Sequence, residues 1–155
     1  MRVLITGIAG FLGSKLAHWI LANVPDVEIT GIDDLTCGYI ENVPQEVSFR
    51  TKHLGGTDKI TGDFDYIFHL AASAYEGLSP WIRVRNYQDN LLATAQVVNH
   101  CLEHPPIRLV FASSMAVYGR QTPPFDESLP RCPIDPYGVA KSASERDAVS
   151  IGRTR

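Results

Sequence analysis

The sequence predicts an α/β fold in which a doubly wound parallel sheet is covered by helices on both faces. Short apolar runs alternate with longer amphipathic stretches along the chain, which is typical of strands joined by crossover helices. Turn residues separate the runs, and the chain has no internal repeat. The 155 residues, 45% hydrophobic and 20% charged, suit one ordinary globular domain.

The predicted strands are short apolar runs. We expect them at residues 2–6, 27–33, 46–50, 65–72 and 107–114. A first helix is predicted over 11–22, because apolar side chains recur there at helical spacing.

Two further helices are predicted downstream. A long helix is expected over 80–103, with Pro80 in its first turn and Ser79 as its N-cap. A proline-rich loop then leads to a last helix over 137–151. Residues 51–64 have room for only a stub of helix, because glycines interrupt them.

Charge, apolar runs and cysteines argue against several classes of protein. The formal charge of −3 disfavours nucleic acid as a partner, since phosphate binding needs a basic face. No apolar run approaches the roughly 20 residues of a membrane span, and none near the start resembles a signal peptide. Three cysteines without CxxC spacing suggest neither a disulfide framework nor a zinc site. We therefore expect a cytoplasmic protein without membrane, nucleic-acid or metal partners.

Three glycines at intervals of three separate the first strand from the first helix. Gly7 would permit a sharp exit from the strand, Gly10 the close approach of a phosphate, and Gly13 tight packing of helix on sheet. A helix start also offers unpaired N–H groups and a positive dipole end to a phosphate. The motif alone fits a plain structural turn equally well.

An acidic pair at the end of the second strand favours the phosphate interpretation. Asp33 lies 20 residues beyond Gly13 (33 − 13), the distance expected of an acid that binds the adenosine ribose hydroxyls of a dinucleotide. A carboxylate here would repel the 2′-phosphate of NADP, and no arginine follows Asp34 directly. We therefore expect NAD as the cofactor. An ordinary acidic turn is the alternative interpretation.

A second group of polar residues lies late in the chain. Tyr137 and Lys141 are four residues apart, so they share one helix face. A phenol is a poor base at neutral pH, but a nearby ammonium favours the phenolate. Ser114 ends the last predicted strand, at the sheet edge where parallel sheets bind their ligands.

Together these motifs resemble the extended short-chain dehydrogenase/reductases. Within them the chain is most similar to the NAD-dependent sugar-nucleotide epimerase/dehydratase family, of the UDP-glucose 4-epimerase type. The residues that carry the resemblance are Gly7-x-x-Gly10-x-x-Gly13, Asp33, His69-Leu70-Ala71-Ala72, Asn90, Ser113-Ser114, Tyr118-Gly119 and Tyr137-x-x-x-Lys141. The match runs from Met1 to about Ala148.

The resemblance implies catalytic roles for three residues. Tyr137 would take a proton from the 4-hydroxyl of a nucleotide sugar while hydride passes to NAD. Lys141 would hold the nicotinamide ribose and favour the phenolate, and Ser114 would bond the same substrate oxygen. The expected substrate is a nucleotide sugar, most simply a UDP-sugar.

The resemblance also implies how NAD is held. The backbone N–H groups of Phe11 and Leu12 would face the pyrophosphate, and Asn90 would support the strand ends. The adenosine and ribose side of the cleft would be lined by Leu70, Ala71 and Ala72, beyond the acidic pair Asp33-Asp34.

The chain departs from the family in two ways. Many relatives carry a Gly-Asp pair after the third strand, where this chain has Lys52-His53. Family members are also about twice as long. The resemblance therefore implies a truncated Rossmann-type sheet that lacks the C-terminal substrate-binding region, with residues 1–148 as the NAD-binding domain and 149–155 as a tail.

The residues after Ser114 favour one reaction over another. Dehydratases of this family place an acidic pair there, because eliminating water needs an added acid and base. Met115 and Ala116 cannot supply them, so 4-epimerisation is preferred; a plain dehydrogenase and a non-catalytic dinucleotide-binding module stay open as alternatives.

Other conspicuous residues receive structural interpretations. His69 is expected to be a hydrogen-bonded core histidine. Arg83 and Arg85 are expected on a solvent-exposed helix face, with contacts to an anion as the alternative. The apolar stripes of helices 80–103 and 137–151 fit either a homodimer, as in relatives, or packing on the chain's own sheet.

Overall fold

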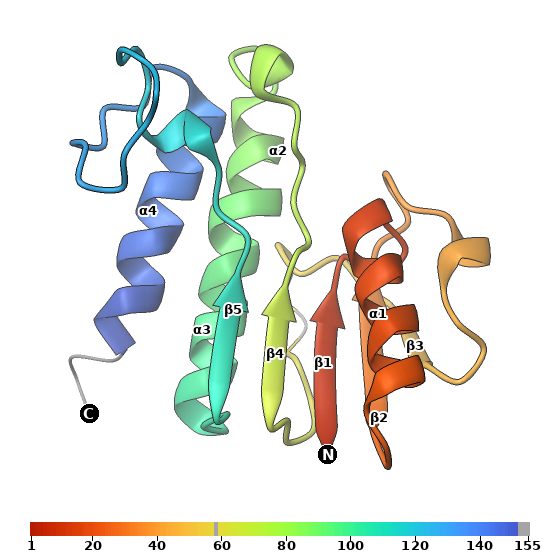
Figure 1. Cartoon of the computed structure of the whole chain (residues 1–155). Helices are drawn as coiled ribbons and strands as arrows, with labels where there is room; N and C mark the ends of the chain where they lie inside the picture. Colours follow the sequence, from red (N-terminus) through yellow and green to blue (C-terminus); the bar gives the residue numbers. More distant parts are fainter. Residues whose placement is uncertain (58, 152–155) are drawn as a thin grey trace.

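Five parallel strands form one sheet in the computed structural model, which describes residues 1–57 and 59–151 (Figure 1). The strands are β1 (Arg2–Thr6), β2 (Glu28–Asp33), β3 (Ser48–Thr51), β4 (Tyr66–His69) and β5 (Arg108–Phe111). Their order across the sheet is β3-β2-β1-β4-β5, with every neighbouring pair parallel. This is the first part of the Rossmann order, and the predicted fold class is confirmed.

The chain reverses its direction across the sheet at β1. From β1 it builds outward through β2 and β3, then crosses back to β4 and β5 on the other side. The loops after β1 and β4 therefore leave the sheet in opposite directions and open a crevice at its carboxyl edge.

The helices divide between the two faces of the sheet. Helix α1 (Phe11–Asn23) covers one face, and α2 (Arg83–Tyr87), α3 (Ala93–Glu103) and α4 (Pro136–Ile151) lie on the other (Figure 1). A π-helical turn, η3 (Gln88–Leu92), joins α2 to α3. Single 3₁₀ turns occur at η1 (Ile40–Asn42), η2 (Glu76–Leu78) and η4 (Met115–Val117).

Alternate side chains of each strand enter two separate cores. On the α1 side, Val3 and Ile5 pack with Ala17 and Ile20. On the α3 side, the core is formed by Leu4, Ile32, Ile67, Ala93, Val97 and Cys101, among others. A strand buried on both faces explains why the apolar run of β1 is continuous rather than alternating.

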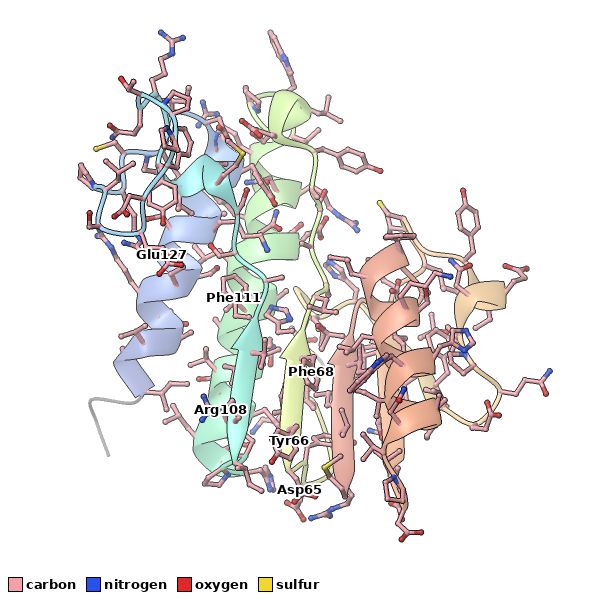
Figure 2. All side chains as sticks on the ribbon, in the orientation of Figure 1. Asp65, Tyr66, Phe68, Arg108, Phe111 and Glu127 are labelled. Carbon is pink, nitrogen blue, oxygen red and sulfur yellow. The ribbon has the colours of Figure 1, made fainter. Side chains whose placement is uncertain are left out.

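The α1 side of the sheet is covered only in part by the described helices. Tyr66 and Phe68 on β4 are half-buried, and the neighbouring Arg108 on β5 is exposed (Figure 2). Their pairing, Tyr66 with Arg108 and Phe68 with Val110, puts them on the same face as Val3 and Ile5.

Several predicted boundaries need correction. Strand β4 ends at His69 rather than residue 72, and β5 at Phe111 rather than residue 114, because His69 and Phe111 are the last paired positions. The residues that follow form loops at the carboxyl edge. The predicted last helix begins one residue earlier than expected, at Pro136.

The predicted N-cap at Ser79 is wrong, and the helix expected from residue 80 begins at Arg83. Ser79 itself has helical dihedral angles (φ −53°, ψ −34°), which an N-cap residue does not adopt. Its buried hydroxyl donates to the carbonyl of Glu76 (2.7 Å) and accepts the N–H of Tyr137 (3.2 Å). Ser79 therefore satisfies a free N–H at the start of α4 instead.

Two further expectations concern segments at the margins of the fold. No helix forms among the described residues of 52–64, in keeping with the glycines there. Residues 149–151 of the expected tail form the end of α4, and the remainder of it, 152–155, lies outside the described residues. In the described parts of the chain, every helix is too short or too polar to cross a membrane.

Candidate functional site

A pocket opens at the carboxyl edge of the sheet, where β1, β2 and β4 end. Its walls come from the glycine turn, the tip of β2, the segment after β3, the loop after β4 and one side of α2–α3. Of the residues predicted for a cofactor site, the pocket brings together Gly7, Gly10, Asp33, Asp34, Leu70, Ala71 and Ala72.

The remaining predicted residues lie outside this pocket. Gly13 is buried behind the glycine turn, and Asn90 is buried beneath the loop after β4. Phe11 and Leu12 are in the first turn of α1 with exposed side chains. The expected catalytic residues Ser114, Tyr137 and Lys141 lie further along the same sheet edge, beyond β5.

The three glycines of the turn have different reasons to be glycine. Gly7 has φ +73°, and a Cβ there would lie 2.7 Å from the backbone nitrogen of Ala71. A Cβ at Gly13 would lie 2.2 Å from the carbonyl oxygen of Gly7. The fold itself therefore requires both. At Gly10 a Cβ would lie 3.3 Å from the carbonyl oxygen of Gly7, a tight contact that a shift of a few tenths of an ångström relieves, and φ is −79°, so the fold needs glycine less there.

The open side of Gly10 is the place where a ligand would come close to the backbone. Gly10 lines the pocket and is the N-cap of α1, with no side chain capping the helix. The first N–H groups of a helix have no partner within it, and the dipole makes this end positive. A phosphate group would find both features here.

Asp33 joins the glycine turn to the tip of β2. Its buried carboxylate accepts the N–H of Ala9 through Oδ2 (3.0 Å) and the N–H of Leu35 through Oδ1 (2.8 Å). Each carboxylate oxygen has two lone pairs, so one on each stays available to a ligand hydroxyl. Asp33 thus lines the pocket, aimed at the glycine turn as predicted.

A charged network that the sequence did not reveal forms part of the pocket wall. Arg85 donates from Nε to Asp89 Oδ2 (2.7 Å) and from Nη2 to Asp34 Oδ2 (3.2 Å) and Thr36 Oγ1 (3.3 Å). His53 Nε2 lies 2.7 Å from Asp89 Oδ1. The side chain of Arg85 is exposed as expected, at 45%, but it also reaches across to the loop after β2 and lines the pocket. Its only local signal was an acid four residues later.

A chain of buried hydrogen bonds positions the loop after β4. Thr94 Oγ1 donates its proton to the carbonyl of Asn90 (2.6 Å), so it must accept from His69 Nε2 (3.1 Å). His69 Nδ1 then accepts from Thr6 Oγ1 (2.7 Å). Burial, with the nearby Lys141 charge, lowers the pKa of His69 to about 3, so the ring is neutral. His69 is the core histidine that was predicted.

Thr6 links this chain of hydrogen bonds to the pocket wall. Its Oγ1 also accepts the N–H groups of Leu70 (3.2 Å) and Ala71 (3.1 Å), two residues of the pocket wall. The side chain of Asn90 donates to the carbonyl of Ser73 (3.2 Å) a few residues on. Asn90 therefore supports the wall from behind and does not face the pocket.

Lys141 and Tyr137 occupy a buried corner beside the end of β5. Lys141 Nζ donates to the carbonyl of Ala112 (2.9 Å) and lies 4.7 Å from the centre of the Phe111 ring and 6.0 Å from that of Tyr137. Burial lowers the pKa of Lys141 to about 8. A cation so close to Tyr137 stabilises negative charge on the phenol oxygen.

Ser114 lies on the segment that α4 packs against. It is the N-cap of η4, and its Oγ accepts the N–H of Ala116 (3.2 Å). A Cβ at Gly138 would lie 2.6 Å from the carbonyl oxygen of Ala116, so glycine permits this contact next to Tyr137. The start of α4 and the Ser114 turn are thus held together.

Glu145 ties the proline-rich loop to α4. One of its carboxylate oxygens accepts from Ser113 Oγ (2.6 Å) and the other from Arg131 Nε (2.5 Å). Arg131 also lies 5.9 Å from the centre of the Tyr118 ring. The loop that follows Ser114 is therefore anchored one turn beyond Lys141, a role that no local motif signalled.

Comparisons with known proteins agree on one family. A family model described as "NAD dependent epimerase/dehydratase family" matches residues 3–155. The UDP-glucose 4-epimerase of Azospirillum brasilense is 33% identical over 94% of the chain and 43% of that protein. The dTDP-glucose 4,6-dehydratase of Streptomyces antibioticus is 32% identical over 99% of the chain and 50% of that protein.

A solved structure extends the likeness to three dimensions. The Thermus thermophilus UDP-glucose 4-epimerase in complex with NAD superimposes with a TM-score of 0.88 at 31% identity, over 99% of this chain and 51% of the other. The chain thus spans about half the length of the relatives it matches.

Proposed function

The chain belongs to the NAD-dependent epimerase/dehydratase family, and from this premise we propose that it forms the NAD-binding and catalytic half of a nucleotide-sugar 4-epimerase of the UDP-glucose type. In this proposal residues 1–148 are the NAD-binding domain. The observation that carries it is the shared sheet edge: a pocket left open at Gly10 and a buried Tyr137–Lys141 pair lie along the same row of strand ends.

The residues of the pocket fit NAD. The open side of Gly10 and the start of α1, with the N–H groups of Phe11 and Leu12, suit a pyrophosphate. The carboxylate of Asp33 suits the hydroxyls of a ribose. The small side chains of Ala71 and Ala72 leave room for the adenosine half, and Leu70 adds an apolar contact.

The proposed chemistry begins with removal of a proton. NAD, when bound, supplies a hydride acceptor. Tyr137 takes the proton of the sugar 4-hydroxyl, and the Lys141 ammonium stabilises the phenolate that does so. Ser114 donates a hydrogen bond to the same substrate oxygen. After the keto-sugar has rotated within the site, Tyr137 returns the proton to its C4 oxygen.

Epimerisation is preferred to dehydration because of the residues that follow Ser114. Water elimination needs an additional acid and base, and Met115 and Ala116 can be neither. Both reactions occur among the matched relatives, so family membership alone does not choose between them.

A dinucleotide-binding module without catalysis of its own is the second candidate. It requires only the pocket at the carboxyl edge of the sheet, whose lining suits a dinucleotide. In either case we propose a cytoplasmic protein, in keeping with the small number of cysteines in the sequence and their lack of CxxC spacing.

The test combines calorimetry with turnover. We expect the chain to bind NAD, and the full-length parent that contains it to interconvert UDP-glucose and UDP-galactose when NAD is present, as followed by NMR. Tyr137→Phe should abolish turnover and leave NAD binding within about twofold, because the phenol oxygen makes no fold-stabilising bond among those described. Near-normal turnover in Tyr137→Phe would refute the assignment of Tyr137 as the base. A calorimetric heat of binding for NAD but none for the UDP-sugar would favour the non-catalytic module.

A homodimer through the exposed helix faces completes the proposal. Exposed apolar side chains occur just before α2 (Trp81), on α2 and η3 (Val84 and Leu92) and on α4 (Val139 and Val149). Burying such side chains favours association. Sedimentation equilibrium should give twice the chain mass, and a monomer at all accessible concentrations would refute this part.

A further inference from the structure

Arg85 occupies the position from which an arginine would reach the phosphate of NADP. It comes from α2, yet its guanidinium lies beside Asp34 and Thr36, directly after the strand that ends in Asp33. In dinucleotide-binding sheets, an acid at this strand tip binds the ribose 2′-hydroxyl, and an arginine nearby accommodates a 2′-phosphate. The pocket therefore holds both the acid typical of NAD sites and the arginine typical of NADP sites.

Three of the five N–H donors of Arg85 are already engaged. Nε is bonded to Asp89 and both Nη2 hydrogens have acceptors, in Asp34 and Thr36. Asp89 is itself held by His53 and has a side chain only 11% exposed, whereas the side chain of Asp34 is 27% exposed. Asp34 is thus the more accessible of the two carboxylates that hold the guanidinium.

The net charge of the pocket wall also disfavours a phosphate. Its carboxylates belong to Asp33, Asp34 and Asp89, and its permanent cations to Lys52 and Arg85. A 2′-phosphate would add about two negative charges to a wall on which acids already outnumber bases. A neutral ribose hydroxyl adds none.

We propose that Asp34 and Asp89 clamp Arg85, that this clamp makes the pocket select NAD over NADP, and that Asp34 is the residue that keeps it closed. The inference rests on the proposed NAD site. Without the Asp34 charge, the two Nη2 hydrogens face the strand tip without an anionic partner there, and an arginine fork binds phosphate well.

The test compares NAD and NADP affinity in matched variants by calorimetry at low ionic strength. Asp34→Asn keeps an oxygen to accept the N–H of Thr36 but loses the charge. We expect its preference for NADP relative to NAD to rise roughly tenfold or more. Asp34→Ser is the second variant, to be used if Asp34→Asn does not fold.

Two controls separate the clamp from a simple change in charge. In Asp34→Asn/Arg85→Gln the gain in NADP affinity should disappear, since the arginine that would bind the phosphate is gone. Asp63→Asn alters the net charge equally at an exposed site at the other end of the sheet and should leave both affinities unchanged. High salt should reduce the gain.

The outcomes distinguish this inference from the function it rests on. Normal NAD binding without an NADP gain in Asp34→Asn would overturn the clamp alone, and so would a gain that survives removal of Arg85. A folded parent protein that binds no NAD would overturn the proposed function and the clamp together.

Discussion

Replacement of single glycines by alanine separates ligand binding from folding at the turn after β1. At Gly10 a Cβ meets no atom closer than 3.3 Å, and φ of −79° is allowed for alanine. At Gly13 the same atom would lie 2.2 Å from the Gly7 carbonyl oxygen and 2.7 Å from Cα of Ile8. The first change is therefore cheap for the fold, whereas the second forces α1 away from the sheet.

The expected magnitudes follow from these contacts. Gly10→Ala should cost about 0.5–1 kcal/mol, since alanine is a poorer N-cap than glycine. Gly13→Ala gains about 1 kcal/mol of helix propensity but should lose about 3 kcal/mol or more to the overlap. For a domain of this size, 1 kcal/mol corresponds to roughly 2–4 °C in Tm. Tm should therefore fall by less than about 4 °C in Gly10→Ala and by more than that in Gly13→Ala.

Calorimetry with NAD provides the second half of this test. Gly10→Ala should reduce NAD affinity at least about tenfold, because the new methyl group lies where the pyrophosphate approaches the backbone. Circular dichroism melts of both variants show whether each is folded at the temperature of the titration. A folded Gly10→Ala protein that binds NAD within about twofold of the parent would refute the reasoning.

Two further predictions concern the start of α4. The pKa of Lys141 is lowered to about 8 in the folded chain, so between pH 8 and 10.5 the unfolded state binds more protons and stability should rise with pH, by at most about 3 kcal/mol. Lys141→Met should flatten that rise in the free energy of unfolding, as measured with urea. An unchanged pH dependence in this variant would show that Lys141 does not cause the rise. Ser79→Ala should lose about 1–3 kcal/mol, because the buried N–H of Tyr137 loses its acceptor. Urea unfolding measures this loss, and the exposed Ser128→Ala is the matched control, expected to change stability by less than about 0.5 kcal/mol.

Local sequence patterns predicted the order of elements well because the strands are buried on both faces. Each of the five apolar runs became a strand of the parallel sheet. The pattern overran the ends of β4 and β5, since the apolar and small residues continue beyond His69 and Phe111 although strand pairing stops there. Where a strand ends is decided by its neighbours, which the local sequence does not contain.

The candidate site shows the same division between local and distant signals. The spacing of the three glycines and the distance from Gly13 to Asp33 predicted that Gly10 and Asp33 line one pocket, and they do. The position of Arg85 depends on a contact with Asp34, 51 residues away, and Ser79 serves Tyr137 across 58 residues. No helical periodicity signals partners so distant. The catalytic roles of Ser114, Tyr137 and Lys141 stay predictions that rest on family resemblance.

The most direct test of the central claim is an NMR titration of the amide-labelled protein with NAD. If the turn after β1 receives the pyrophosphate, the largest amide shifts should fall on Gly10, Phe11 and Leu12, with Ala9 and Leu35, the two donors to Asp33, close behind. Saturable binding that shifts other amides and leaves these unmoved would contradict the account.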